Sequence, residues 1–276
     1  MRCDYCYWFR DLDVKEKPTK EQYTRVVQEI AKRPKASLLI LGGEPTTDPA
    51  LPDILEQAVA AGISEIAVGT NFIKPNKYFQ SLPHRDKVAI NISIHLDVFK
   101  NTSQRGLDAY IDKIIKFYKS PGGKKIRIGM VIDNRYADRV VYVMERLKEV
   151  KCMKYPILLT HENYTYYDLD QSTVDRVKPY FSEAFTVYKI NGVEHNLLDD
   201  AVNQGPKFTG YWCNSNTIEV FATGDVNVTC SNRPVGNVYT TDDVIKNFNP
   251  LQRCTVPFCD NFNRILLTKK KYGKYT

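Results

Sequence analysis

Two cysteines at the start of the chain are of a type and spacing that could bind a metal. Cys3 and Cys6 form a Cys-x-x-Cys pair, which is followed by Tyr7 and Trp8. Two thiolates alone cannot complete a tetrahedral zinc site or hold a four-iron cluster. A thioredoxin-type dithiol is a poorer interpretation, because that motif follows a strand and opens a helix, and no strand pattern precedes Cys3. The pair therefore needs a further ligand from elsewhere.

A glycine-rich turn is the second feature with chemical potential. Gly42, Gly43, Glu44 and Pro45 directly follow the apolar run at residues 38–41. Adjacent glycines let the backbone approach a ligand closely, and Glu44 would place an anion beside a ligand ammonium group. A strand-to-helix turn of this kind is common in α/β proteins, so it gains meaning only in company with the cysteines.

Four cysteines near the C-terminus form a second possible metal site. Cys213, Cys230, Cys254 and Cys259 are spaced C-x16-C-x23-C-x4-C. Four thiolates suffice for one iron–sulfur cluster or one structural zinc ion. Cys152 lies at the end of a helical pattern, and we expect it to be a small buried hydrophobic residue.

The segment at residues 2–8, Arg-Cys-Asp-Tyr-Cys-Tyr-Trp, together with the Gly-Gly-Glu-Pro turn resembles the radical S-adenosylmethionine enzymes. Their cluster motif is C-x-x-x-C-x-x-C, and its first cysteine is missing here. That cysteine would lie two residues before Met1, so we expect Met1 to be an internal methionine of a longer product. The alternative is a genuine start with a degenerate site. The family's first barrel strand is missing too, which favours truncation.

The resemblance implies a 4Fe-4S cluster, to which Cys3 and Cys6 would contribute two of three thiolates. The open iron binds the amino and carboxylate groups of S-adenosylmethionine, which is cleaved reductively to a 5'-deoxyadenosyl radical that abstracts hydrogen. The family usually reads Thr-Asn-Gly where this chain has Phe72 in third place, and His95 is equally well interpreted as a core histidine. The residues that the resemblance assigns to the S-adenosylmethionine site are Gly42, Gly43, Glu44, Pro45, Thr70, Asn71, Ser93 and His95.

The C-terminal segment resembles the SPASM or twitch extensions of the same superfamily. Between its cysteines lie a hairpin pattern at residues 217–228 and a Gly-Asn-Val step at residues 236–238. SPASM domains carry seven cysteines for two auxiliary clusters, whereas the four here allow only one. The resemblance therefore implies one auxiliary 4Fe-4S cluster, with zinc as the alternative.

The hydrophobic pattern predicts an α/β fold. Helical and short apolar segments alternate up to about residue 160, which is typical of βα units around a parallel sheet. Apolar runs predict strands at 38–41, 66–68, 88–95, 126–132 and 157–159, and a further strand upstream would complete the open (βα)6 barrel of the resembled family. We expect a radical S-adenosylmethionine core at 1–165, a linking region with a hairpin at 166–212, and a small β-rich, cysteine-containing domain at 213–276.

Composition limits the compartment and the partners. The 276 residues are 43% hydrophobic and 12% aromatic, which is ample for a packed core. The sequence contains no membrane-spanning run and no signal-peptide pattern, and its seven cysteines suit a reducing compartment, so we expect a cytoplasmic protein. The net charge of +7 is modest and partly due to a basic C-terminal tail, so nucleic acid is not an expected partner.

Two functions from different classes follow. The first is a radical S-adenosylmethionine enzyme acting on a peptide or protein side chain, with flavodoxin or ferredoxin as electron donor. The second is a degenerate, non-catalytic homologue whose C-terminal cysteines hold zinc or an iron–sulfur cluster. Iron and sulfide content after anaerobic reconstitution distinguishes the two.

Overall fold

The computed structural model describes residues 17–159, 169–183, 186–190, 193–205, 209, 212–214, 217–228, 233–249, 251–253 and 269–270. The chain divides into two compact units. One comprises residues 1–131 and 138–154, and the other comprises residues 132–137 and 155–276.

The first unit contains most of a parallel β-sheet. Strands β1 to β4 pair in parallel, the sheet order is β1-β2-β3-β4-β5, and β5 passes into the second unit at Tyr155. The strands are β1 (Ser37–Ile40), β2 (Glu65–Thr70), β3 (Val88–Ile94), β4 (Ile126–Ile132) and β5 (Met153–Leu158). The helices are α1 (Lys20–Ala31), α2 (Leu51–Ala60), α3 (Asn76–Gln80), α4 (Gln104–Lys119) and α5 (Ala137–Arg146). The α/β architecture predicted from the sequence is confirmed.

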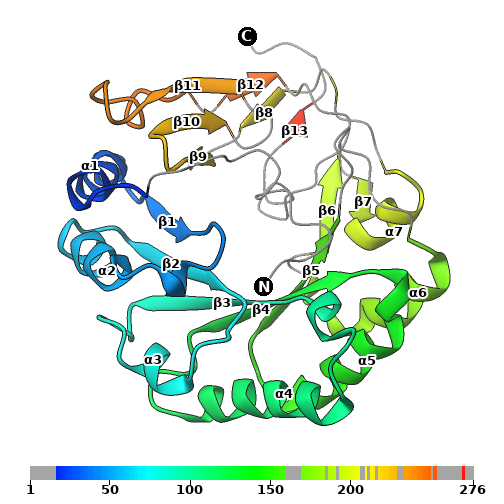
Figure 1. Ribbon diagram of the computed structural model, residues 1–276. Helices are drawn as coiled ribbons and strands as arrows, with labels where there is room; N and C mark the ends of the chain where they lie inside the picture. The colour runs from blue at the N-terminus through cyan, green and yellow to red at the C-terminus, as the bar shows by residue number, and fades with distance from the viewer. Residues whose placement is uncertain are drawn as a thin grey trace. The chain divides into compact units, whose positions relative to one another are not determined.

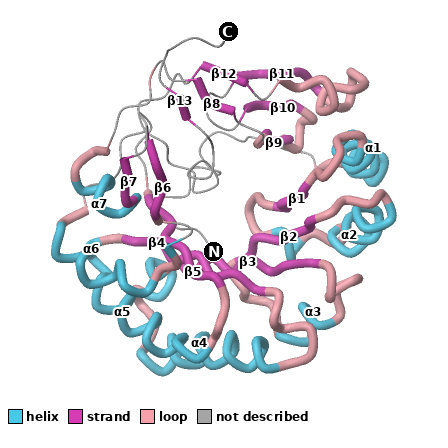
Figure 2. Tube along the Cα trace, turned by 180° about the vertical axis from the view of Figure 1, so that it is seen from behind, coloured by secondary structure: helices cyan, strands magenta, loops and turns pink. Residues whose placement is uncertain are grey.

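Helices α2, α3 and α4 lie along the outer side of strands β2 to β4 (Figures 1 and 2). The core fills the layer between them, where Leu55, Ile90, Ile114 and Phe117 have no exposed surface. Strand β3 alternates in its sequence and burial: one face carries four fully buried apolar residues, Val88, Ile90, Ile92 and Ile94, and the other carries Ala89, Asn91 and Ser93, of which Ala89 and Ser93 are half-buried.

Local signals set several element ends. The Thr19 side chain accepts from the Gln22 N–H, and the Gln22 side chain accepts from the Thr19 N–H at 2.7 Å, which forms a capping box at the start of α1. Gly62 follows α2 with a φ of +77°. Helix α2 begins at Leu51, and the Asp48 carboxylate before it accepts from the N–H of Ala50 and from the hydroxyl of Tyr23, each at 2.9 Å.

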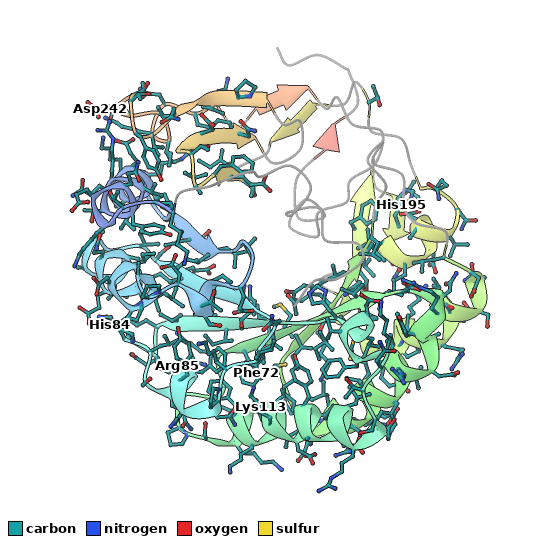
Figure 3. The ribbon with its side chains drawn as sticks, viewed as in Figure 1. Phe72, His84, Arg85, Lys113, His195 and Asp242 are labelled. Atoms are coloured by element: carbon teal, nitrogen blue, oxygen red, sulfur yellow. The ribbon has the colours of Figure 1, made fainter. Side chains whose placement is uncertain are left out.

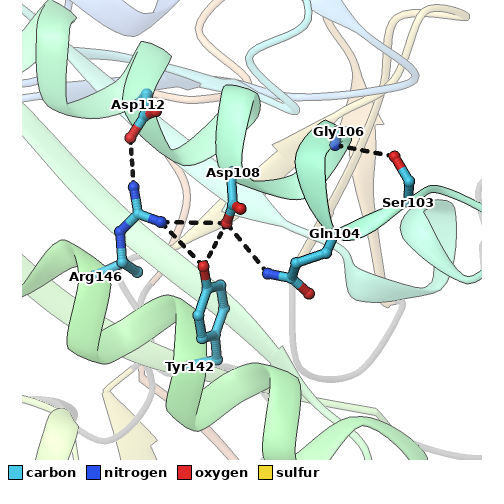
Figure 4. A network of polar contacts seen from close by, with 7 residues as sticks. All are labelled: Ser103, Gln104, Gly106, Asp108, Asp112, Tyr142 and Arg146. Carbon is cyan, nitrogen blue, oxygen red and sulfur yellow. Dashed lines mark hydrogen bonds and ion pairs between the residues drawn. The ribbon is translucent and has the colours of Figure 1, made fainter.

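A polar network joins helices α4 and α5 on the surface of the first unit (Figure 4). Arg146 donates to Asp108 at 3.2 Å, to Asp112 at 2.6 Å and to the hydroxyl of Tyr142 at 3.0 Å. Tyr142 and Gln104 also donate to Asp108. The hydrogen bond from Tyr142 is the main cause of a lowered pKa at Asp108. Because these groups are partly exposed, we expect the network to add little to stability.

The second unit carries short antiparallel sheets. Strands β6 and β7 form a hairpin, β9 to β11 form a three-stranded sheet, and β8 lies between β12 and β13. The hairpin predicted at 217–228 is confirmed as β9 and β10, whereas β11 was not predicted. The bounds are α6 (Gln171–Val177), β6 (Val187–Ile190), β7 (Val193–Asn196), α7 (Leu197–Val202), β8 (Trp212–Asn214), β9 (Ile218–Val220), β10 (Asp225–Val228), β11 (Arg233–Asn237), β12 (Leu251–Arg253) and β13 (Lys269–Lys270).

Within the described ranges, none of the helices has the length and apolar character that crossing a membrane requires.

Candidate functional site

The carboxylate of Glu44 joins two turns that lie far apart in the sequence. Its Oε1 accepts from the hydroxyl of Thr70 at 2.7 Å, and its Oε2 accepts from the backbone N–H of Asn71 at 2.8 Å. Oε1 also accepts from the N–H of Thr46 at 3.2 Å and from its hydroxyl at 2.5 Å. The turn at residues 42–45 and the turn at residues 70–72 are thus held together by one side chain.

The parallel sheet brings these turns to the same edge. Strand β1 ends at Ile40 and β2 ends at Thr70, and Leu39 of β1 is in register with Ala67 of β2. Carboxyl ends of adjacent parallel strands share one edge, where α/β proteins bind their ligands. Pro45 then opens a 3-10 helix, Pro45–Thr47, for which Glu44 is the N-cap. Four sequence-predicted residues, Glu44, Pro45, Thr70 and Asn71, are therefore neighbours.

The two glycines of the 42–45 turn leave room for a ligand. Gly42 has a φ of +119°, which side chains rarely adopt, so this position requires glycine. Gly43 has no such constraint, yet among the described residues a Cβ built on either glycine meets no atom within 4 Å. The backbone at Gly43 is exposed and open to a small ligand. The site therefore fits S-adenosylmethionine in having an open backbone beside a carboxylate.

Ser93 and His95 lie on the adjacent strand β3 and directly after it. Ser93 is in register with Gly129 of β4, and His95 is the N-cap of the 3-10 helix Leu96–Phe99. Burial lowers the pKa of His95, while the negative charges of Asp97 and Glu44 act in the opposite direction. His95 is thus within the electrostatic reach of Glu44, and burial favours its neutral form.

Phe72 adopts a backbone conformation suited to glycine. Its φ is +58°, at the position where the resembled family has Gly. For a residue with a side chain, the left-handed region costs roughly 1–2 kcal/mol. The ring has no exposed surface and stacks on Phe79 at a centroid distance of 4.3 Å, with Phe117 at 5.3 Å. Packing of the ring therefore offsets a strained backbone beside Asn71.

Helix α4 supplies two residues that the sequence analysis did not assign to the site. The hydroxyl of Tyr110 donates to the carbonyl of Asn71 at 2.9 Å. The ammonium of Lys113 donates to the carbonyls of Phe72 and Ile73, the latter at 2.8 Å. The sequence signal for this pair is the three-residue spacing of Tyr110 and Lys113, which puts both on one helix face.

The predicted metal ligands lie almost entirely outside the described residues. This holds for Cys3, Cys6, Cys230, Cys254 and Cys259, while the backbone of Cys213 lies in β8, opposite Gln252 and Lys269. In the described ranges, no three His, Cys, Asp or Glu side chains are grouped to hold a metal ion. The cysteine assignments therefore remain predictions.

Comparison with known proteins adds sequence and fold relatives. No family model matches the chain. A probable GTP 3',8-cyclase from Metallosphaera sedula is 30% identical over 118 residues, which cover 41% of this chain and 37% of that protein. The crystal structure of Streptococcus suis SuiB bound to S-adenosylmethionine is similar with a TM-score of 0.55 and 18% identity. SuiB bound to its precursor peptide SuiA gives a TM-score of 0.56 and 20% identity.

The chain has the radical S-adenosylmethionine fold. The sequence match and the structural matches support the resemblance stated from the sequence. The structural matches cover 88% of this chain but 60% of SuiB, so the chain spans less than two thirds of the relatives it matches. Within this radical S-adenosylmethionine fold, the Glu44 carboxylate and its two turns lie at the carboxyl edge of the sheet.

Proposed function

We propose that this protein is a radical S-adenosylmethionine enzyme that generates a 5'-deoxyadenosyl radical for hydrogen abstraction from a peptide or protein side chain. The observation that carries the proposal is the Glu44 carboxylate, which ties the 42–45 turn to Thr70 and Asn71 at the carboxyl edge of a sheet like that of SuiB. Support for the ligand comes from SuiB, whose structure contains S-adenosylmethionine.

The residues of this chain would bind and orient the cofactor. The open space over Gly43 would accept the methionyl part of S-adenosylmethionine against the backbone. Glu44 would add a negative charge near its ammonium group, because Oε2 accepts a hydrogen bond from the N–H of Asn71 and a carboxylate oxygen can accept a second. Thr70 and Asn71 would fix that carboxylate, and Ser93 and His95 would border the site from β3.

The metal centres belong to the same proposal. Cys3 and Cys6, with a third thiolate, would hold the 4Fe-4S cluster, which supplies the electron for cleavage of the sulfonium when it is bound. Cys213, Cys230, Cys254 and Cys259 would hold one auxiliary 4Fe-4S cluster, or a zinc ion, in a SPASM-like domain at residues 213–276.

A peptide or protein is the proposed substrate, and SuiB bound to its precursor peptide SuiA supports this class. Flavodoxin or ferredoxin is the proposed electron donor. The core would occupy residues 1–165, and the linking region would occupy residues 166–212. A cytoplasmic location agrees with the use of thiolates for metals.

The glycine pair provides a sharp test. Gly43→Ala should leave the melting temperature unchanged, because no atom of the described part of the chain lies within 4 Å of the new methyl group. It should weaken binding of S-adenosylmethionine, measured by equilibrium dialysis on anaerobically reconstituted protein, by about tenfold or more. Gly42→Ala is the comparison for the stability measurement. Because Gly42 has a φ of +119°, an alanine there should make the protein less stable by about 1–3 kcal/mol.

Equal affinity of Gly43→Ala and the unmodified protein would refute the assignment of the 42–45 turn to the cofactor. Iron and sulfide analysis of the same samples addresses the alternative function. Zinc bound without iron, together with no retention of S-adenosylmethionine, would identify a metal-binding module and contradict the enzyme proposal.

A further inference from the structure

The 70–72 turn is held from the side of helix α4 as well as from Glu44. Thr70 donates its hydroxyl hydrogen to Glu44 and accepts from the N–H of Phe72 at 3.0 Å. Asn71 offers its N–H to Glu44 and its carbonyl to Tyr110. The peptide groups around Asn71 thus face Glu44 on one side and α4 on the other.

Lys113 makes the strongest contact from α4. Its ammonium bonds two consecutive carbonyls, those of Phe72 and Ile73, and lies 4.9 Å from the centroid of the Phe72 ring. Figure 3 shows Phe72 and Lys113 close together in the layer between the sheet and α4. Burial lowers the pKa of Lys113, and in its charged form the ammonium donates hydrogen bonds about twice as strong as those of a neutral donor.

The strain at Phe72 gives these contacts a purpose beyond packing. A phenylalanine with a φ of +58° would relax toward ordinary backbone angles unless its neighbours prevented it. Relaxation of φ at residue 72 would turn the adjoining peptide and move the Asn71 carbonyl away from Tyr110. The N–H of Asn71, which meets Glu44, belongs to the same three-residue turn and would shift with it.

We propose that Tyr110 and Lys113 are positioning residues, which hold the strained 70–72 turn so that Thr70 and Asn71 present their donors to Glu44. The consequence for S-adenosylmethionine rests on the proposed function, whereas the consequence for the turn itself does not. Neither residue needs to touch the cofactor. Their effect passes through the backbone of residues 71–73 to the carboxylate that would face the ligand.

The test uses two variants with a matched control each. Tyr110→Phe removes only the hydroxyl that bonds Asn71, and Tyr142→Phe removes a hydroxyl from the surface network between α4 and α5. Lys113→Met removes the ammonium and keeps the stem, and Lys116→Met makes the same change at an exposed position of α4. Each control alters the same chemistry without touching the turn.

Hydrogen exchange of ligand-free protein is the first readout. We expect the amides of residues 71–73 to exchange about tenfold faster in Tyr110→Phe, and faster still in Lys113→Met. Each variant loses hydrogen bonds from α4 that stabilise the 70–72 turn in its hydrogen-bonded form. Tyr142→Phe and Lys116→Met should leave this segment unchanged. Unchanged exchange in both test variants would overturn the proposal, as would equal changes in the controls.

Equilibrium dialysis with S-adenosylmethionine on reconstituted protein is the second readout. We expect affinity to fall about fivefold to tenfold in the two test variants, with melting temperatures within the range of the controls. Faster exchange with unchanged affinity would overturn the positioning role. If the unmodified protein retains no S-adenosylmethionine, the proposed function fails, and the exchange data alone then decide whether Tyr110 and Lys113 hold the turn.

Discussion

Replacing Phe72 by glycine should destabilise the protein less than replacing it by alanine. Both substitutions remove a fully buried ring and should cost about 3–5 kcal/mol of unfolding free energy. Glycine also relieves the left-handed backbone, worth about 1–2 kcal/mol, and loses about 0.4–1 kcal/mol through the greater freedom of the unfolded chain. The balance predicts Phe72→Gly to be more stable than Phe72→Ala by about 0.5–1 kcal/mol.

Phe79 provides the control for this comparison. It is equally buried and stacks on Phe72, but it lies within helix α3. Glycine in a helix is about 1 kcal/mol less favourable than alanine, so Phe79→Gly should be less stable than Phe79→Ala. The cost of the lost ring cancels within each pair, so the sign of the difference tests only the backbone.

Urea unfolding followed by far-ultraviolet circular dichroism would give the four free energies, provided that the slopes agree among variants. The two pairs should differ by about 1.5–2 kcal/mol in the glycine-minus-alanine comparison. If glycine is as unfavourable at position 72 as at position 79, the strained turn does not exist in solution. Tyr110 and Lys113 would then have no strained turn to hold.

Three further outcomes are expected. Glu44→Gln should lower the unfolding free energy by about 2 kcal/mol, because a neutral amide replaces the carboxylate and the charge-assisted hydrogen bond to the backbone N–H is lost. The control is Glu56→Gln at an exposed position of α2, which should have no measurable effect in the same urea titration. Because burial lowers the pKa of His95 below its unfolded value of 6.5, protonation favours unfolding, and stability should rise with pH up to about 6.5. The nearby negative charges of Asp97 and Glu44 oppose this effect of burial. In His95→Asn the rise of stability with pH should be smaller. If the unfolding free energy of this variant follows the same pH profile as the unmodified protein between pH 5 and 7.5, His95 is not the cause of the rise. Burial raises the pKa of Cys152 to about 11, so this thiol should react with iodoacetamide at pH 8 about 100-fold more slowly than an exposed thiol. Peptide mass spectrometry would follow the alkylation. Comparable rates would show that the thiol is accessible.

Much of the sheet could be predicted because its determinants are local. The run at residues 126–132 was predicted with the same bounds as β4, since an apolar segment bounded by turn signals specifies a buried strand. The capping box at Thr19 is equally local, since its two partners are three residues apart. The hydrogen bond from Tyr23 to Asp48 joins residues 25 positions apart, and no local pattern reveals it.

The site was predicted in its residue types but not in its connections. The glycine pair and Glu44 were recognisable from their order in the chain, and Thr70 and Asn71 from their place after a strand. That Glu44 bonds both of these residues depends on the register of β1 against β2, which sequence periodicity does not fix. The departure at Phe72 was visible as a missing glycine, but its left-handed backbone and its contacts with Lys113 required the tertiary structure.

The hydrogen bonds of Glu44 join groups of the protein to one another and involve no ligand atom. The conformational entropy of ordering the two turns is therefore lost during folding and not during ligand binding. A small molecule that reaches this edge of the sheet meets preorganised groups, and little of its interaction energy is spent on arranging them. The local order of the turns and the affinity for a ligand then depend on the same few contacts, so a substitution that loosens the turns also weakens ligand binding.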